Sequence, residues 1–99
     1  MTREEALKIL NLALPSLKER YGIKDLAIFG SVARNEARND SDVDILVDFN
    51  PGYPGGYFKF FTLQEELEGA LGSKVDLVTP DALKKSLRDR ILSEAIYAA

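Results

Sequence analysis

The side chains best suited to chemistry in this sequence are three aspartates, Asp42, Asp44 and Asp76. Asp42 and Asp44 belong to a segment of alternating hydrophobic and polar residues, which predicts a β-strand over Asp42–Phe49 with both carboxylates on one face. Two carboxylates held this close repel one another unless a cation lies between them. The spacing therefore predicts a cation site, and Asp76 lies in another short predicted strand.

The residues that the chain lacks narrow the choice of cation. There is no cysteine and no histidine, which excludes disulfides, thiolate sites and the usual zinc ligands. A metal bound here must use oxygen ligands. This requirement favours a hard cation such as Mg²⁺ or Mn²⁺.

A Gly30-Ser31 pair follows the predicted strand Leu26–Phe29. Glycine before the N-terminus of a helix is a common phosphate-binding arrangement, because backbone N–H groups point outward there. We expect Ser31 to cap a brief helix that runs through Arg34 and Glu36. The pair is therefore a candidate for binding phosphate.

The predicted elements follow the order αβαβαβα, which indicates an α/β domain with a small mixed sheet covered by helices. The first helix begins at Thr2 and ends at Gly22, and Pro15 predicts a kink or a break within it. Thr79 and Pro80 predict the start of the last helix. If the second strand is antiparallel to the first and the third is parallel to the second, all the candidate residues meet at one edge of the sheet.

Each feature alone also has an ordinary structural explanation. A Gly-Ser pair after a strand is usually a turn, and an Asp-x-Asp pair in a strand often faces solvent. Asp76 alone could pair with Lys74 at the surface. The prediction of a site depends on the convergence of all these residues.

Length and composition set the class of protein. The 99 residues are 45% hydrophobic and 29% charged, which indicates one globular domain over residues 1–99. The chain has no long apolar run, so we expect no membrane segment and a cytoplasmic location. Its net charge of -3 argues against binding to extended nucleic acid.

The run from Phe29 to Phe49 resembles the signature of the MNT-type minimal nucleotidyltransferases, relatives of DNA polymerase beta. It reads Gly-Ser, then Ala-Arg-Asn-Glu, then Ser-Asp-Val-Asp and a hydrophobic tail, and Val75–Val78 resembles the family's third acidic strand. Asn35 stands where the family usually has glycine, and asparagine tolerates left-handed backbone angles. The resemblance covers nearly the whole chain and implies the polymerase beta-like nucleotidyltransferase fold.

The resemblance also implies a reaction. Asp42, Asp44 and Asp76 would hold two Mg²⁺ ions, or Mn²⁺, around an NTP, with ATP as the expected substrate. Asp76 would also help to deprotonate the acceptor hydroxyl. Gly30 and Ser31 would bind the β- and γ-phosphates.

Two further polar residues of this run are Arg34 and Asp48. Arg34 either contacts a phosphate or is a solvated helix residue. Asp48 shares a strand face with Asp42 and Asp44 but lies four residues beyond Asp44, roughly 13 Å further along. We therefore leave Asp48 out of the site.

Single-domain members of this family commonly act as antitoxins that transfer AMP to a tyrosine of a HEPN-domain ribonuclease, so the resemblance implies such a partner. Phe58 and Phe61, with Tyr53 and Tyr57 nearby, either pack under the Asn50–Gly56 loop or form an exposed aromatic patch for that partner. Two alternatives remain open. One is a non-catalytic antitoxin that neutralises its partner by contact, and the other is a transferase acting on RNA or a small molecule.

Overall fold

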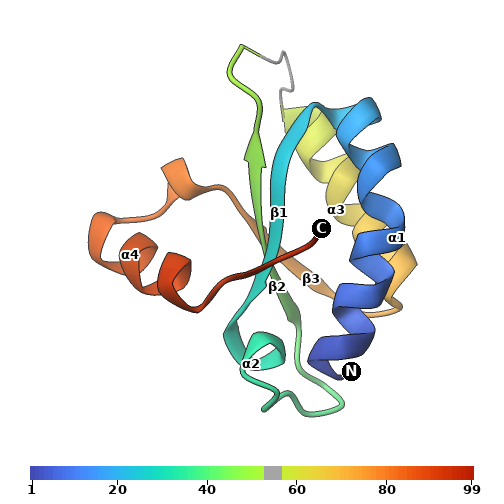
Figure 1. The fold of residues 1–99 in the computed structure, drawn as a ribbon, viewed down its shortest axis with the longest axis vertical. Coiled ribbons are helices and arrows are strands. Elements are labelled where there is room, and N and C mark those ends of the chain that lie inside the picture. The colour runs from blue at the N-terminus through green and yellow to red at the C-terminus, as the bar shows by residue number, and fades with distance from the viewer. Residues whose placement is uncertain (53–56) are drawn as a thin grey trace.

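The computed structural model describes residues 1–52 and 57–99. Figure 1 shows the elements in chain order, from the blue N-terminal helix to the red C-terminal segment. They are α1 (Arg3–Tyr21), β1 (Ile23–Phe29), α2 (Gly30–Ala33), β2 (Val43–Phe49), α3 (Tyr57–Leu71), β3 (Val75–Val78), the 3₁₀ helix η1 (Pro80–Ala82), α4 (Lys85–Glu94) and β4 (Ile96–Tyr97).

The strands form one mixed sheet in the order β3-β2-β1-β4. β2 is antiparallel to β1 and parallel to β3, as predicted. β4 is antiparallel to β1 and was not predicted. The α/β class and the small mixed sheet covered by helices are therefore confirmed, with one short edge strand in addition.

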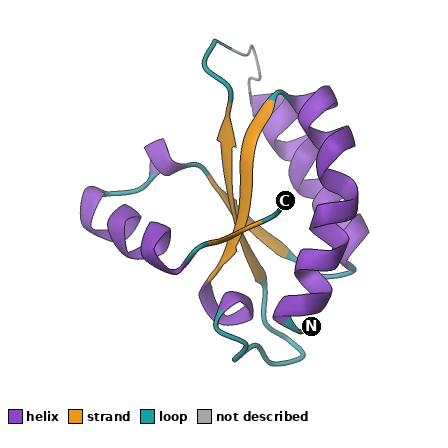
Figure 2. Cartoon of the chain, viewed as in Figure 1, coloured by secondary structure: helices purple, strands orange, loops and turns teal. Residues whose placement is uncertain are grey.

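The two faces of the sheet are covered unequally. α1 and α3 lie on one face, and α4 lies on the other (Figure 2). The main hydrophobic core lies between the sheet and the α1/α3 layer, and its largest fully buried side chains include Leu10, Leu17, Ile28, Ile45, Leu63 and Leu67. On the α4 face the buried cluster consists only of Ala27, Phe29, Leu46 and Ile91. The α4 side therefore has room for polar side chains next to the sheet.

Helix α1 is continuous although it contains Pro15. Of the two predicted effects of Pro15, the break into two helices is therefore wrong, and the kink stays a prediction. Proline removes one backbone donor and strains the preceding turn, but Leu14 and Leu17 on either side are buried in the core. The ends agree with the sequence, because the hydroxyl of Thr2 accepts a hydrogen bond from the Glu5 N–H (3.1 Å) and Gly22 follows the helix with φ 64°.

Two predicted helix starts are also wrong. The carbonyl of Gly30 accepts the Arg34 N–H (3.1 Å), so α2 begins at Gly30, and Ser31 lies inside its first turn and does not cap it. Pro80 begins the short helix η1, and the last helix starts later, at Lys85. Asn35 has φ 61°, which agrees with the expectation that asparagine adopts the left-handed turn.

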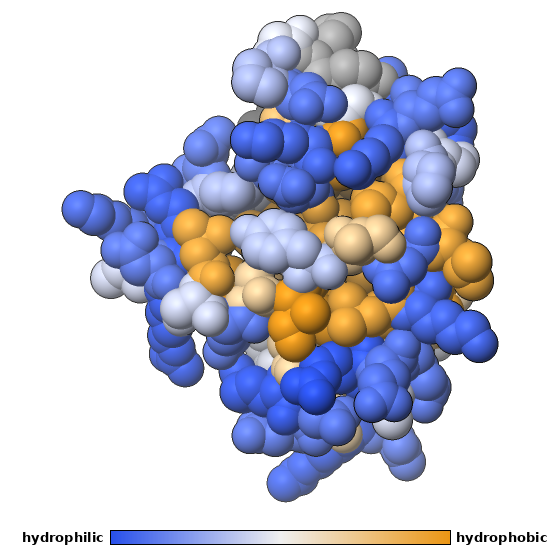
Figure 3. Space-filling model, in the orientation of Figure 1, coloured by the Kyte–Doolittle hydropathy of each residue, from blue (hydrophilic) through white to orange (hydrophobic). Residues whose placement is uncertain are grey.

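Figure 3 shows the molecular surface in the orientation of Figure 1. This face is mostly polar, and its apolar residues gather near the middle, around the C-terminal segment. Large hydrophobic side chains exposed in the described residues include Leu12 of α1, Leu92 of α4 and Tyr97 of β4. None of the helices formed by residues 1–52 and 57–99 is long and apolar enough to span a membrane.

Candidate active site

The predicted site residues come together where β1 ends and where β2 and β3 begin. Asp44 is the register partner of Phe29 in β1 and of Asp76 in β3. Gly30 follows Phe29 directly, and Asp42 lies one residue before β2. The convergence that the strand directions predicted is therefore present in the structure.

Strand alternation determines which face carries the carboxylates. Val43 and Ile45 of β2 belong to the core under α1 and α3, whereas Leu46 belongs to the cluster with Ile91 of α4. Asp44 shares the face of Leu46, because successive strand residues point to opposite faces. Asp76 lies on the same face, since its neighbours Val75 and Leu77 are in the main core. The carboxylates thus lie on the thinly covered side of the sheet.

The negative charge of Asp44 is unfavourable on this face of the sheet when no cation is bound. Partial burial is the largest factor that raises the pKa of Asp44, to about 6, and the charges of Asp76 and Asp42 raise it further. Glu94 adds to this effect, and Arg34 opposes it. The carboxylates therefore repel one another, as their spacing predicted.

Gly30 is required by its contact with Asp44. Its φ is +71°, and a Cβ at this position would lie 2.0 Å from Oδ2 of Asp44. No side chain can occupy that position unless Asp44 moves. The backbone of Gly30 and the carboxylate of Asp44 thus form one packed unit.

Glu94 is part of the site and was missed by the sequence analysis. Its Oε1 accepts the backbone N–H of Gly30 (3.0 Å). The Nη1 group of Arg34 donates to both carboxylate oxygens of Glu94, at 3.3 and 3.2 Å, and the Nε of Arg34 donates to Glu36 (3.2 Å). No sequence signal identifies Glu94, because only the packing of α4 brings it to Gly30.

Ser31 and Arg34 lie near Gly30, whereas Asp48 lies further along the sheet. Ser31 is half-buried in α2, beside Gly30, and Arg34 reaches Glu94 across the site. Asp48 is the register partner of Asp25, away from the Gly30 end of β1, and its exclusion from the site stays a prediction. None of the ion pairs in the described part of the chain joins Asp76 to Lys74.

The carboxylate oxygens of Asp42, Asp44 and Asp76 are suitable ligands for a hard divalent cation. In this structure they do not converge on a single metal position. Within residues 1–52 and 57–99, no three acidic side chains form a ready-made metal cage. Asp42 and Asp76 are exposed, so their carboxylates can change rotamer without disturbing the core. All three donors are oxygens and they repel one another, which is the chemistry that Mg²⁺ binding relieves.

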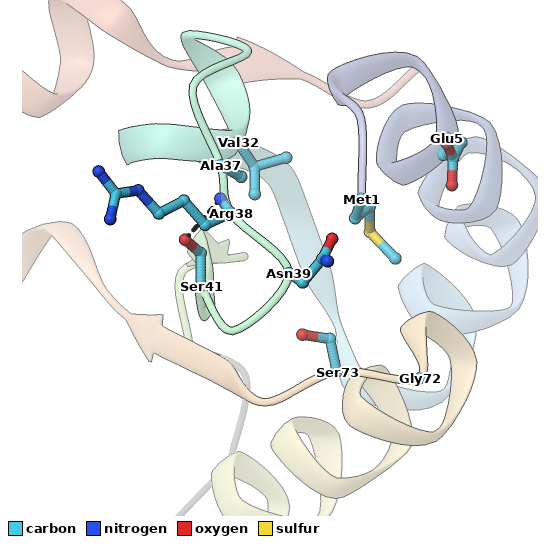
Figure 4. A pocket seen from close by; sticks show the side chains of 9 residues that line it. All are labelled: Met1, Glu5, Val32, Ala37, Arg38, Asn39, Ser41, Gly72 and Ser73. Atoms are coloured by element: carbon cyan, nitrogen blue, oxygen red, sulfur yellow. Dashed lines mark hydrogen bonds between the residues drawn. The ribbon is translucent and has the colours of Figure 1, made fainter.

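A hollow lies beside the site, between the start of α1, the loop before β2 and the turn after α3 (Figure 4). The hydroxyl of Ser41 accepts the backbone N–H of Arg38 (2.9 Å) in this loop. Besides Arg38 and Ser41, the hollow is lined by Met1, Glu5, Val32, Ala37, Asn39, Gly72 and Ser73. None of the three aspartates lines this hollow, but Asp42 lines an adjoining one between the same loop and the turn after α3.

Of the four residues of the predicted aromatic patch, Phe61 is the one whose side chain the structure describes. Phe61 is 57% exposed and makes an edge-to-face contact with Phe60, with ring centroids 6.0 Å apart. The exposed alternative is therefore correct for Phe61. Tyr53 and the side chains of Tyr57 and Phe58 lie outside the described residues.

Comparison with known proteins agrees with this geometry. Residues 10–98 match the family model of the nucleotidyltransferase domain. The chain is 44% identical to the protein adenylyltransferase MntA of Thermococcus cleftensis over 98% of this chain and 96% of that protein. A solved structure described as a minimal nucleotidyltransferase is 43% identical, with a TM-score of 0.80 over 97% of this chain and 95% of that chain.

A more distant crystal structure, of a toxin-antitoxin with AMP-PNP, is 22% identical and has a TM-score of 0.64 over 100% of this chain and 73% of that chain. At this identity the likeness concerns the fold alone. The family match extends over most of the chain, and the 44% identity extends over nearly all of it. The chain therefore belongs to the nucleotidyltransferase domain family and is a nucleotidyltransferase.

Proposed function

We propose that this chain transfers AMP from ATP to a hydroxyl group of a partner protein and acts as the antitoxin of that partner. The observation that carries the proposal is the junction of Gly30, Asp44 and Asp76, where β1, β2 and β3 bring carboxylate side chains next to the backbone of Gly30. The similarity to a protein adenylyltransferase over nearly the full chain supports AMP as the transferred group.

In this proposal, Asp42, Asp44 and Asp76 hold Mg²⁺, and Mn²⁺ is the alternative ion. The bound cations would neutralise charge on the triphosphate and stabilise the entering and leaving oxygens. The N–H groups of Gly30 and Ser31 bind the β- and γ-phosphates. Their fixed position holds the α-phosphate in line with the acceptor, and such positioning supplies much of the rate enhancement.

The transfer itself is a single displacement. The acceptor oxygen forms a bond to the α-phosphorus of ATP, the bond from that phosphorus to the bridging oxygen breaks, and pyrophosphate leaves. Asp76 accepts the proton of the acceptor hydroxyl. Asp76 is suited to this because it is exposed at the start of β3, beside Asp44 in the sheet.

We propose further that the acceptor is a tyrosine of a HEPN-type toxin. Asp42 and Asp76 are exposed, so a large acceptor with its own docking surface can reach them. A solved structure of the same fold is a toxin-antitoxin with AMP-PNP, and the proposal extends its kind of partner and its nucleotide to this chain.

Intact mass spectrometry tests the proposal. The chain is mixed with the protein encoded beside it, ATP and Mg²⁺, and we expect the neighbour to gain one AMP. The gain should be absent with Asp42→Asn or with EDTA. An unmodified neighbour that is still neutralised would favour the contact antitoxin, and AMP on added tRNA or an aminoglycoside would favour the other transferase activities.

A further inference from the structure

The proposed function assigns the Gly30 N–H to a phosphate of ATP. In this structure the same N–H donates a hydrogen bond to the side-chain carboxylate of Glu94. Glu94 accepts that N–H at 3.0 Å and accepts Arg34 through both of its carboxylate oxygens. Gly30 and Glu94 are 64 residues apart in sequence. The contact therefore depends on where α4 ends, and local structure around Gly30 does not produce it.

We propose that Glu94 is an internal substitute for a phosphate group, and that ATP must displace its carboxylate from Gly30 and Arg34 before transfer can begin. This inference rests on the proposed function, since it concerns the same phosphate position. It adds a self-blocking contact that lowers the affinity of the free protein for nucleotide.

The carboxylate of Glu94 lies in an unfavourable place. It is on the last residue of α4, where the helix dipole disfavours negative charge. It also faces the aspartate cluster, because its charge acts on Asp44 in the same direction as those of Asp42 and Asp76. Among the described residues, the Gly30 N–H and Arg34 oppose these effects, and a more highly charged anion can compete for both.

α4 is loosely attached, which makes the displacement feasible. Ile91 is the buried residue of this helix, while Leu87 and Leu92 are 44% and 40% exposed. The strand that follows, β4, has two residues and pairs at the edge of the sheet. Segments with few buried contacts open at low free-energy cost, so Glu94 can leave without unfolding the core.

The test compares ATP binding by the full chain and its Glu94 variants. Glu94→Gln keeps the size of the side chain and removes its charge, and Glu94→Ala removes the contact entirely. Calorimetry with MgATP should show binding tightened roughly three- to tenfold in both variants. Glu36→Gln is the matched control, because Glu36 also binds Arg34 but does not reach Gly30. We expect its affinity to change less than about twofold.

The backbone amide of Gly30 gives a second readout that does not require turnover. Its ¹⁵N–¹H resonance should move in Glu94→Ala without nucleotide, and in the native chain when MgATP is added. Native-like ATP affinity in both Glu94 variants, or weaker binding, would overturn the inference and leave the proposed function intact. Absence of ATP binding in the native chain and in all the variants would overturn both.

Discussion

At the scale of single residues, the identity of Gly30 is determined by two independent requirements. Its backbone has a positive φ, which disfavours every residue with a Cβ, and the space where a Cβ would lie holds the carboxylate of Asp44. The Gly-Ser pair and the Asp-x-Asp pair of the sequence are therefore coupled by direct contact. A change at one position alters the other.

We predict that Gly30→Ala abolishes transfer and lowers the melting temperature. The positive φ costs about 1–2 kcal/mol in a residue with a Cβ, and the clash with Asp44 adds to this cost. Gly72→Ala is the control, because Gly72 has φ +66° but nothing within 4 Å of its Cβ position. Thermal unfolding and the mass assay should show that Gly72→Ala loses stability only. Equal activity in the two variants would contradict the role given to this contact.

The raised pKa of Asp44 predicts that the stability of the metal-free fold depends on pH. Its pKa in the folded protein is about 6, above the value of about 3.9 in an unfolded chain. Ionisation of Asp44 therefore destabilises the fold, and this cost is absent below pH 4, grows between pH 4 and 6, and is complete above pH 6. Asp44→Asn should then be more stable than the metal-free native chain by about 1–3 kcal/mol at pH 8.

The difference should disappear near pH 4, where the native carboxyl is protonated. Denaturant unfolding in EDTA at the two pH values measures it. A variant that is equally stable or less stable at pH 8 would show that Asp44 has a structural role instead.

At the scale of elements, the sequence was most informative where the pattern is local. The alternation around Asp42 and Asp44 predicts β2 and its face, because burial of Val43, Ile45 and Val47 forces the aspartate to the other side. β4 could not be predicted, since two residues carry no periodicity. Glu94 could not be predicted either, because its contact with Gly30 depends on how α4 packs.

A contact between α1 and α3 supports the main core at its edge. Glu66 of α3 accepts hydrogen bonds from Arg20 and from the hydroxyl of Tyr21 (3.3 Å) in α1. The bond from Arg20 is the main reason that the pKa of Glu66 is lowered. The contact therefore stabilises the fold above about pH 4.3, the unfolded value, and this stability is lost as the pH falls through the lowered pKa.

We predict that Glu66→Gln lowers the free energy of unfolding by about 0.5–1 kcal/mol at pH 7, the range for partly exposed ion pairs. The effect should shrink as the pH falls below about 4.3 and through the lowered pKa of Glu66, and transfer activity should not change. Glu65→Gln, at an exposed position on the same helix, serves as the control and should be neutral. A loss of stability that does not change as the pH falls would point to packing instead of charge.

At the scale of the whole molecule, one face of the sheet carries the main core and the other carries the proposed site. α1 and α3 bury the main core on the first face, while α4 covers the second face only in part. The carboxylates lie on this second face, within reach of a large acceptor. The same thin cover allows Glu94 to contact the site and to leave it.

The exposed ring of Phe61 is the candidate contact for the partner. We predict that Phe61→Ser reduces modification of the neighbour protein and leaves MgATP affinity unchanged, because Phe61 lies on α3, on the opposite side of the sheet from α4. Leu12→Ser is the control, since Leu12 is also exposed, at 76%, but lies on α1. Modification that is unaffected at saturating ATP would exclude Phe61 from the interface.

The central claim is that Asp42, Asp44 and Asp76 form a cation-dependent nucleotide site. Calorimetry with ATP tests it most directly, with Mg²⁺ and with EDTA, on the native chain and on Asp44→Asn. The account predicts that the native chain binds ATP only when Mg²⁺ is present, and that Asp44→Asn loses this binding while it remains folded. Equal affinity for ATP with and without the cation would contradict the account.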